Sequence, residues 1–499
     1  MVNYFGLYVG NSTASIALFK EDGKVEILAN EAGERVTAAV VTVNSDEKVV
    51  GSTAGATSYS LASCAVKYNK RLLDVTISDE SMKTWISESL VKIDGETLNS
   101  LTYSVSVEDS KKPLSCSTTQ IASLIFKKLY GIGVGGAPGQ DSFSCVIAVP
   151  THWDDKSRQI VADAATQAGW EVMQVINEPA AALLAYQIGF EKPPVDQIAL
   201  VYRLGGVSCD ATVVSIENGF QTIVSHVRDD SLGGKDIISV VTEHLCDEFK
   251  RKYYLDPRES RKAMWKLKIA AMGIIHTLST ISTSSRFIES VCDGVDFNPT
   301  ISQARFEALL SPLIPKFTAP IHQALIEAGV EKNQISKVVL CGGVLKVPKM
   351  RSVVSSMFDC EICSGLNPDE VLACGAAQQA GLLAGHSDGL GITEASRELP
   401  LLETPVHVQV NDQEVVMGPG VMPISHFMNL SVEEPKVEIS AKQEQPSDSF
   451  IGQGVIECSE AGDLEIHIRL TVDNELVAEA VNTETKELQK VTFALQPVC

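Results

Sequence analysis

Two stretches of the chain combine small residues and hydroxyl groups in the way that phosphate-binding turns do. In the first, within residues 4–19, two apolar runs are separated by Gly10, Asn11 and Ser12. In the second, within residues 200–216, they are separated by Gly205, Gly206 and Ser208. Glycines, which lack a Cβ, let main-chain N–H groups approach a phosphate. One such stretch is most often only a hairpin turn, whereas two copies predict a duplicated fold whose turns face a shared cleft.

Two further turns and one basic run have the composition of ligand-binding segments. Gly342 and Gly343 end an apolar run directly before a predicted helix, where a nucleotide can lie against the backbone. Asp369 precedes a helix of small residues, 373–377, which predicts close approach by another element. The basic run 67–71 leaves two interpretations open: a solvated charged face, or an anion site built on Lys70.

The segments between the turns predict the sheet that positions them. A strand at 145–150, a helix capped by Asp154 or Asp155, a strand at 172–176 and a helix from Pro179 through Ile188 follow one another. This order predicts a parallel sheet covered by helices. Loops at the carboxyl ends of such strands face the ligand cleft, so Pro150, Glu178 and the turn at Gly205 are expected together.

Composition limits the class of protein. The chain has 499 residues, 44% of them hydrophobic, which suffices for a folded core, and its net charge of −22 opposes direct binding to nucleic acid or to an anionic membrane. No apolar run is long enough to span a bilayer, and we expect a cytosolic protein. The twelve cysteines are scattered, which favours buried thiols. Cys360 and Cys363 have the spacing of a metal knuckle but lack a second pair.

The pattern changes from about residue 385. A polar linker, 386–402, is followed by period-two alternation at 406–410 and 464–470, which predicts a small β domain. The predicted organisation is a nucleotide-binding part at 1–385 with lobes of about 1–190 and 191–385, the linker, and a β domain at 403–499.

These segments together resemble the DnaK-type heat-shock chaperones of the 70 kDa class, strongly over residues 1–385 and weakly over 400–499. The resemblance rests on the two hairpins, Val149-Pro150 with the Arg158 helix, 176–182, 232–236, 304–307, 341–343 and 366–370. It implies an α/β, actin-like ATPase fold of the duplicated ribonuclease H type, followed by a small β domain. It also implies ATP as ligand, contacted by Gly10, Asn11, Ser12, Arg203, Gly205, Gly206, Ser208, Gly233, Gly234, His276, Gly342, Gly343, Lys346 and Asp369.

The chain departs from the family at the positions that perform hydrolysis. Lys70 and Glu178 match the family's catalytic lysine and glutamate, but the two aspartates that position Mg²⁺ and the attacking water are Tyr8 and Arg203. Two unit charges about 4 Å apart interact by on the order of 4 kcal/mol at an effective dielectric near 20, so the cation at position 203 repels Mg²⁺. A guanidinium pairs with phosphate oxygens instead. We therefore hypothesise nucleotide binding without Mg²⁺ and without turnover.

Other departures lie around the adenosine site and in the β domain. Val207 replaces a phosphate-binding glycine, Lys346 replaces the arginine that stacks on adenine, and the adenosine-facing helix offers Met272, Ile275 and His276. The β domain carries no helical lid before Cys499. These features resemble an atypical ribosome-associated branch that includes the fungal Ssz chaperone. That branch pairs with a zuotin-like J-domain protein at the ribosome and stimulates an ordinary DnaK-type chaperone acting on nascent or unfolded polypeptides.

Two alternatives remain. The first is a working ATP-driven chaperone that uses substitute residues. The second is a sugar kinase or actin-like filament protein, which the β domain after an apolar linker segment disfavours.

Overall fold

The computed structural model describes most of the chain. The described residues are 3–20, 22–43, 47–51, 64–75, 78–95, 97, 100–106, 113–137, 142–189, 195–217, 220–384, 406–411, 413–417, 426–432, 434–443, 449–457, 461–470, 475–482 and 488–494. The predicted linker, 386–402, lies outside them.

The first lobe is built on a sheet whose strands run in the order β12-β11-β1-β2-β3, with β4 paired to β2. Its strands are β1 Asn3–Val9, β2 Thr13–Phe19, β3 Val25–Ile27, β4 Thr37–Ala38, β11 Phe143–Val149 and β12 Glu171–Asn177. β1 and β2 form the predicted antiparallel hairpin, and β1, β11 and β12 run parallel. Apolar side chains such as Phe5 and Leu7 face one core, which helices α3 (Thr118–Gly136) and α4 (Asp155–Gln167) cover.

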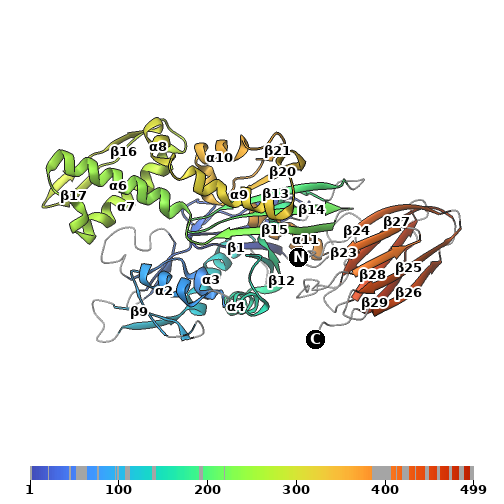
Figure 1. Ribbon diagram of the computed structural model, residues 1–499. Coiled ribbons are helices and arrows are strands. Elements are labelled where there is room, and N and C mark those ends of the chain that lie inside the picture. Colours follow the sequence, from blue (N-terminus) through green and yellow to red (C-terminus); the bar gives the residue numbers. More distant parts are fainter. Residues whose placement is uncertain are drawn as a thin grey trace.

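The second lobe repeats this topology. Its sheet has the order β15-β14-β13-β20-β21, formed by β13 Gln197–Leu204, β14 Cys209–Glu217, β15 Phe220–Asp229, β20 Ile335–Cys341 and β21 Glu361–Cys363. β13 pairs antiparallel with β14 and parallel with β20, as β1 does with β2 and β11. The chain therefore has the duplicated, actin-like α/β fold that the sequence predicted (Figure 1).

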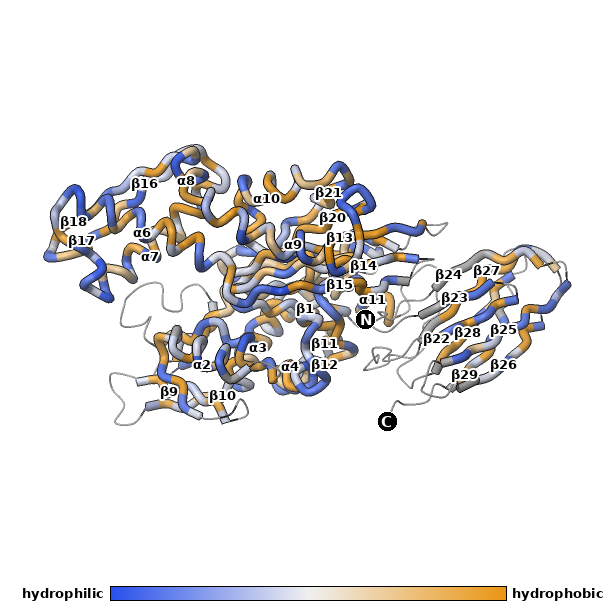
Figure 2. The backbone as a smooth tube through the Cα atoms, viewed as in Figure 1, coloured by the Kyte–Doolittle hydropathy of each residue, from blue (hydrophilic) through white to orange (hydrophobic). Residues whose placement is uncertain are grey.

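Helices cover both sheets. α6 (Gly234–Tyr253), α7 (Arg261–Leu278), α8 (Gln303–Leu310), α9 (Ile314–Ala328) and α10 (Pro348–Ser355) belong to the second lobe. α5 (Glu178–Ala185) and α11 (Val371–Leu383) pack against each other, and a Cβ built at Gly375 would lie 1.6 Å from the Ala181 carbonyl oxygen. The predicted close approach to the small-residue helix is confirmed. Hydrophobic residues predominate along β13 and β20 (Figure 2).

Smaller elements extend each lobe. In the first lobe these are β5 Val41–Val43, β6 Lys48–Val50, β7 Ala65–Val66, η1 Asn69–Leu73, α2 Asp79–Glu88, β8 Lys92–Asp94, β9 Thr102–Val105 and β10 Leu114–Ser117. In the second they are η3 Pro257–Glu259, β16 Thr283–Ser285, β17 Ile288–Cys292, β18 Val295–Phe297, β19 Thr300–Ser302, η4 Lys332–Gln334 and η5 Gly343–Lys346.

The C-terminal part is a β-sandwich. One sheet has the order β23-β22-β25-β26 and the other β24-β27-β28-β29. Its strands are β22 Val406–Val410, β23 Gln413–Met417, β24 His426–Val432, β25 Lys436–Gln443, β26 Ser449–Glu457, β27 Gly462–Leu470, β28 Glu475–Asn482 and β29 Leu488–Ala494. Val408, Ile439 and Ile466 lie in its core, so the predicted alternation is confirmed.

One sequence expectation needs adjustment, and another is confirmed. The helix that begins at Glu178 ends at Ala185, before Ile188, because Gln187 has a left-handed backbone with φ of 54°. Among the cysteines that the structure describes, most are buried, as expected, and Cys292 and Cys360 are half-buried. No helix in the described segments has the length and apolar character needed to cross a membrane.

Candidate nucleotide site between the two lobes

The two hairpin turns lie against each other. The Gly10 N–H donates to the Thr13 carbonyl at 2.8 Å, and the Gly205 N–H donates to the Ser208 carbonyl at 2.9 Å. A Cβ built at Gly206 would lie 2.0 Å from Ser12 Oγ, so the turns of the two lobes touch where Gly206 has no side chain. Asn11 Oδ1 accepts from the backbone N–H of Arg71 at 3.1 Å.

The other predicted glycines surround the second turn. The Gly234 N–H donates to the Gly205 carbonyl at 2.9 Å, and a Cβ at Gly233 would lie 2.6 Å from the Val207 nitrogen. Gly342 has φ of +95°, and a Cβ there would lie 2.3 Å from the Leu204 carbonyl oxygen. Gly233 and Gly342 therefore require glycine because backbone approaches backbone.

On the predicted adenosine side of the site, fewer contacts join the predicted residues to one another. Lys346 forms an ion pair with Asp369, whose backbone carbonyl accepts from the Ser15 hydroxyl at 3.4 Å. A Cβ at Gly343 would lie 3.9 Å from the Asp369 Cβ. His276 lies exposed on α7. Among the residues that the structure describes, no side-chain contact joins it to the glycine turns.

Four buried charged residues lie beside the turns, and we call them the quartet: Lys70, Glu178, Arg203 and Asp210. They are between 4% and 7% exposed. Lys70 Nζ donates to Glu178 Oε1 at 2.7 Å, Arg203 Nε lies 2.8 Å from Glu178 Oε2, and Arg203 Nη2 pairs with Asp210. The same Nη2 donates to Ser208 Oγ at 3.1 Å. The interpretation of the basic run as a solvated face is therefore wrong at Lys70, whose charge is neutralised by a residue distant in sequence.

Three members of the quartet have shifted pKa values. Burial alone would raise the pKa of Glu178, but Lys70 and Arg203 hold it low, at about 2. Burial lowers the pKa of Lys70, although Glu178 opposes this effect. Burial also acts against the charge of Arg203, yet Asp210 and Glu178 raise its pKa well above the ordinary value. Two cations face two anions, so the buried charges balance.

Tyr8 supplies an aromatic ring where the resemblance expects a carboxylate. Lys70 Nζ lies 4.7 Å from the Tyr8 ring centroid and 5.7 Å from that of Trp153, within range of cation–π attraction. Burial, followed by the charge of Glu178, raises the pKa of Tyr8. The phenol therefore stays neutral and offers no anionic oxygen.

These residues fit a phosphate group but do not fit Mg²⁺. Glycine-containing turns of both lobes meet here, and a Cβ at Gly206, Gly233 or Gly342 would collide with neighbouring protein atoms. Exposed main-chain N–H groups of such turns suit close contact with phosphate oxygens. Mg²⁺ prefers an octahedral set of oxygen ligands, whereas the Arg203 guanidinium occupies the space between Glu178 and Asp210. The described segments contain no group of three or more His, Cys, Asp or Glu side chains that would hold a metal ion.

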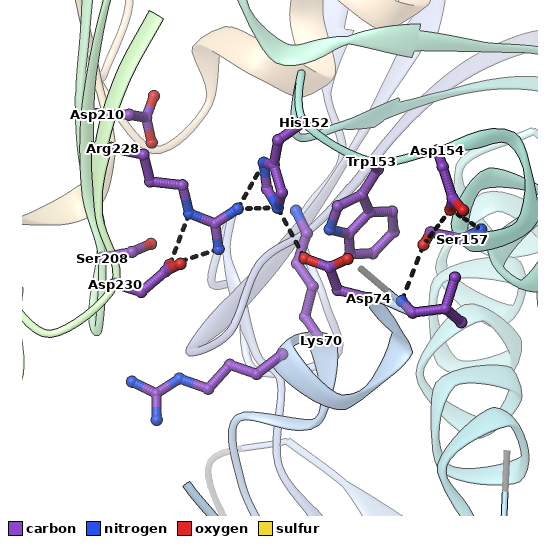
Figure 3. Close-up of polar contacts among 12 residues, drawn as sticks. Lys70, Asp74, His152, Trp153, Asp154, Ser157, Ser208, Asp210, Arg228 and Asp230 are labelled. Atoms are coloured by element: carbon purple, nitrogen blue, oxygen red, sulfur yellow. Dashed lines mark hydrogen bonds and ion pairs between the residues drawn. The ribbon is translucent and has the colours of Figure 1, made fainter. Parts of the chain in front are cut away.

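Sequence reasoning missed Asp210 and a second polar group. The signal for Asp210 was present, since a four-residue turn after Leu204 places residue 210 opposite 203. The second group is Asp74, His152, Arg228 and Asp230, in which Arg228 contacts the His152 ring (Figure 3). These residues come from separate segments, so no local sequence pattern predicts that they lie together. Arg158 steadies the intervening turn by donating to the Trp153 carbonyl at 3.1 Å.

The similarity of this chain to known proteins agrees with the duplicated fold and the glycine turns. The family model described as Hsp70 protein matches residues 4–417. The chain belongs to the Hsp70 family. Hsp70 proteins are chaperones that bind ATP, unfolded polypeptides and J-domain co-chaperones.

Similar relatives are named Heat shock 70 kDa protein 14. That of Xenopus tropicalis is 36% identical over 384 residues, which are 77% of this chain and 75% of the relative. That of Danio rerio is 30% identical over 502 residues, 96% and 98% of the two chains, and that of Homo sapiens 34% over 384 residues, 77% and 74%.

Proposed function

We propose that this Hsp70 protein is a catalytically degenerate co-chaperone that holds ATP with little or no hydrolysis. The quartet is the observation that supports this function best. Arg203 lies between Glu178 and Asp210, and Tyr8 presents a neutral ring, so two positions that would serve a hydrolytic metal carry a cation and a hydrocarbon face. Hydrolysis that depends on Mg²⁺ has no metal ligand at either position.

In this proposal the glycine turns and one edge of the Arg203 guanidinium bind the phosphate. A Cβ built at Gly205 would lie 2.8 Å from Arg203 Nη1, so this nitrogen lies over the turn while Nε and Nη2 face the carboxylates. A guanidinium held in this way offers donors to phosphate oxygens without a bridging cation. We expect the set from Gly10 to Asp369 named above to contact the nucleotide.

The proposed cellular role is co-translational folding in the cytosol. Relatives named Heat shock 70 kDa protein 14 fit the ribosome-associated branch that the sequence resembles, whose members pair with a zuotin-like J-domain protein. The net charge of −22 is compatible with attachment to the ribosome through a basic partner. An ordinary DnaK-type chaperone would then act on the nascent chain.

Titration calorimetry and a hydrolysis assay test the nucleotide part. We expect ATP to bind purified protein equally with Mg²⁺ and with EDTA, and phosphate release to stay at background. Hydrolysis that requires Mg²⁺ and is lost in Lys70→Ala and Glu178→Ala would instead establish an active chaperone, the alternative that the intact Lys70–Glu178 pair favours.

A native pull-down tests the partner. The tagged full chain should recover a J-domain protein together with ribosomal proteins from a lysate, and RNase treatment should release the ribosomal proteins while the J-domain protein stays bound. Recovery of neither class would refute the proposed role.

A further inference from the structure

A row of polar side chains joins the two lobes near Trp153, beside the quartet. Arg228, on β15 of the second lobe, contacts the ring of His152, which lies in the turn after β11 of the first lobe (Figure 3). Arg228 Nε also donates to Asp230 Oδ1 at 2.6 Å, and His152 Nε2 lies 2.8 Å from Asp74 Oδ2. We call these four residues the clamp.

The His152 ring lies at the centre of the clamp. Its Nε2 faces Asp74 Oδ2, and Arg228 Nη1 contacts both ring nitrogens, Nδ1 at 2.5 Å and also Nε2. The ring thus joins a cation of one lobe to a carboxylate of the other, and Asp74 is only 2% exposed. If the lobes part, the clamp loses its central contact, which is partly buried: the His152 and Arg228 side chains are 26% and 14% exposed.

The clamp is linked to the quartet through one residue. Trp153 follows His152, and its ring faces Lys70 Nζ, which pairs with Glu178. Within the quartet, Glu178 lies in the first lobe and binds Arg203 of the second. A shift of the turn that carries His152 and Trp153 therefore disturbs both cross-lobe connections.

A third connection lies at the turns themselves. Arg71 Nη2 of the first lobe donates to the Val207 carbonyl of the second at 3.5 Å, and Gly206 lies against Ser12. The cleft is thus bridged at three places by the chain's own side chains, one of them the buried ion pair of Arg203 with Glu178 and another the partly buried clamp.

We propose that the clamp and the quartet hold the two lobes closed without help from a nucleotide. The domain then presents one constant surface to its partners, whether or not ATP is bound. This inference concerns closure and stands independently of the proposed affinity for ATP.

Hydrogen exchange of the full chain in nucleotide-free buffer tests the inference. The clamp variant is Arg228→Ala, and the matched control is Arg258→Ala, which removes an arginine whose ion pairs with Glu243, Asp247 and Asp256 all lie within the second lobe. We expect amides in 71–75 and 226–230, which include none of the proposed nucleotide contacts, to exchange roughly tenfold faster in Arg228→Ala, the scale of a directly coupled contact. The control should match the wild type, and ATP should change wild-type exchange in these two segments by less than about twofold, below that scale.

A variant from the other lobe guards against a general loss of folding. His152→Phe keeps a ring beside Trp153 but cannot accept from Arg228, and it should accelerate exchange in the same segments. The double variant should be no faster than either single one, because both remove one contact. Slow exchange in both single variants, additive effects in the double variant, or wild-type segments that become protected only when ATP is added would overturn the inference.

Discussion

Arg203 and Asp210 are register partners across the β13–β14 hairpin, and their side chains form a buried ion pair. The pairing follows from turn length, since Leu204 and Cys209 close a turn of four residues and the next pair along the ladder is 203 with 210. A cation at position 203 therefore meets a carboxylate supplied by the same hairpin, before any contact with the other lobe is made.

Removing the charge of Asp210 should destabilise the protein strongly. Asp210→Asn leaves a buried guanidinium with Glu178 as its remaining carboxylate in the quartet, and breaking a buried pair typically costs about 3 kcal/mol or more. Urea unfolding measures the loss. The control Asp247→Asn removes one carboxylate from the exposed Arg258 pairs and should cost less than about 1 kcal/mol. Equal losses would contradict a buried pair.

Arg203→Asp should create a response to Mg²⁺ that the wild type lacks. The introduced carboxylate would join Glu178 and Asp210, giving a set of oxygens that suits this cation, and bound Mg²⁺ would stabilise the folded variant. Thermal unfolding with MgCl₂ and with EDTA is the measurement. Arg261→Asp, at an exposed position on α7, makes the same charge change away from the site and should remain indifferent. A wild-type protein that Mg²⁺ stabilises as much as the variant would argue against exclusion of the metal.

Stability should fall as the pH drops below about 6.5, the ordinary pKa of histidine. Burial lowers the pKa of His226, and although Asp210 opposes this, His152, Arg203 and Arg228 add to it. The unfolded chain therefore binds the proton more readily, so the free energy of unfolding decreases by up to about 1.4 kcal/mol per pH unit below that point.

Substitution at two histidines separates this effect from others. His226→Gln keeps a polar group near Thr212, whose hydroxyl lies 2.8 Å from His226 Nδ1, and should flatten the profile between pH 6.5 and 5. His276→Gln changes an exposed histidine and should retain the wild-type slope. If the free energy of unfolding falls with pH equally in the wild type, His226→Gln and His276→Gln, then a group other than His226 causes the loss.

Gly342→Ala should be among the most damaging small substitutions. Its φ of +95° strains any other residue, and the new Cβ would lie 2.3 Å from the Leu204 carbonyl oxygen. Gly294 has a similar φ of +77° but nothing within 4 Å, so Gly294→Ala reports backbone strain alone, about 1 kcal/mol. We expect Gly342→Ala to lower the free energy of unfolding by several times that amount. Similar unfolding curves for the two variants would rule out the close backbone approach.

Local rules predicted much of the fold. The capping box at Ser117 and Gln120 forms at the start of α3, and Asp154 caps α4 through its bond to the Ser157 N–H. Both depend on residues three apart, which a sequence displays directly. The glycine turns also lie together, because each is a short segment at a strand end.

Long-range pairing explains what the sequence did not reveal. The basic run around Lys70 has the composition of a surface, and only its contact with Glu178, 108 residues away, shows that it is buried. The clamp likewise joins His152 to Arg228, 76 residues apart, through side chains that share no periodic pattern. The first pair depends on packing between distant segments of one lobe and the second on how the two lobes meet, and neither propensity nor spacing encodes such contacts.

The charge balance of the quartet limits how this protein can change over evolutionary time. Replacing Arg203 by a neutral or acidic residue leaves Glu178 and Asp210 with Lys70 as the one remaining cation of that cluster, an excess of buried negative charge. Such a variant is tolerated only if a divalent ion arrives with the substitution, and Tyr8 would still block the neighbouring position. Arg203→Asp alone would therefore restore a place for the cation, whereas regaining hydrolysis requires a further change at Tyr8, in the other lobe.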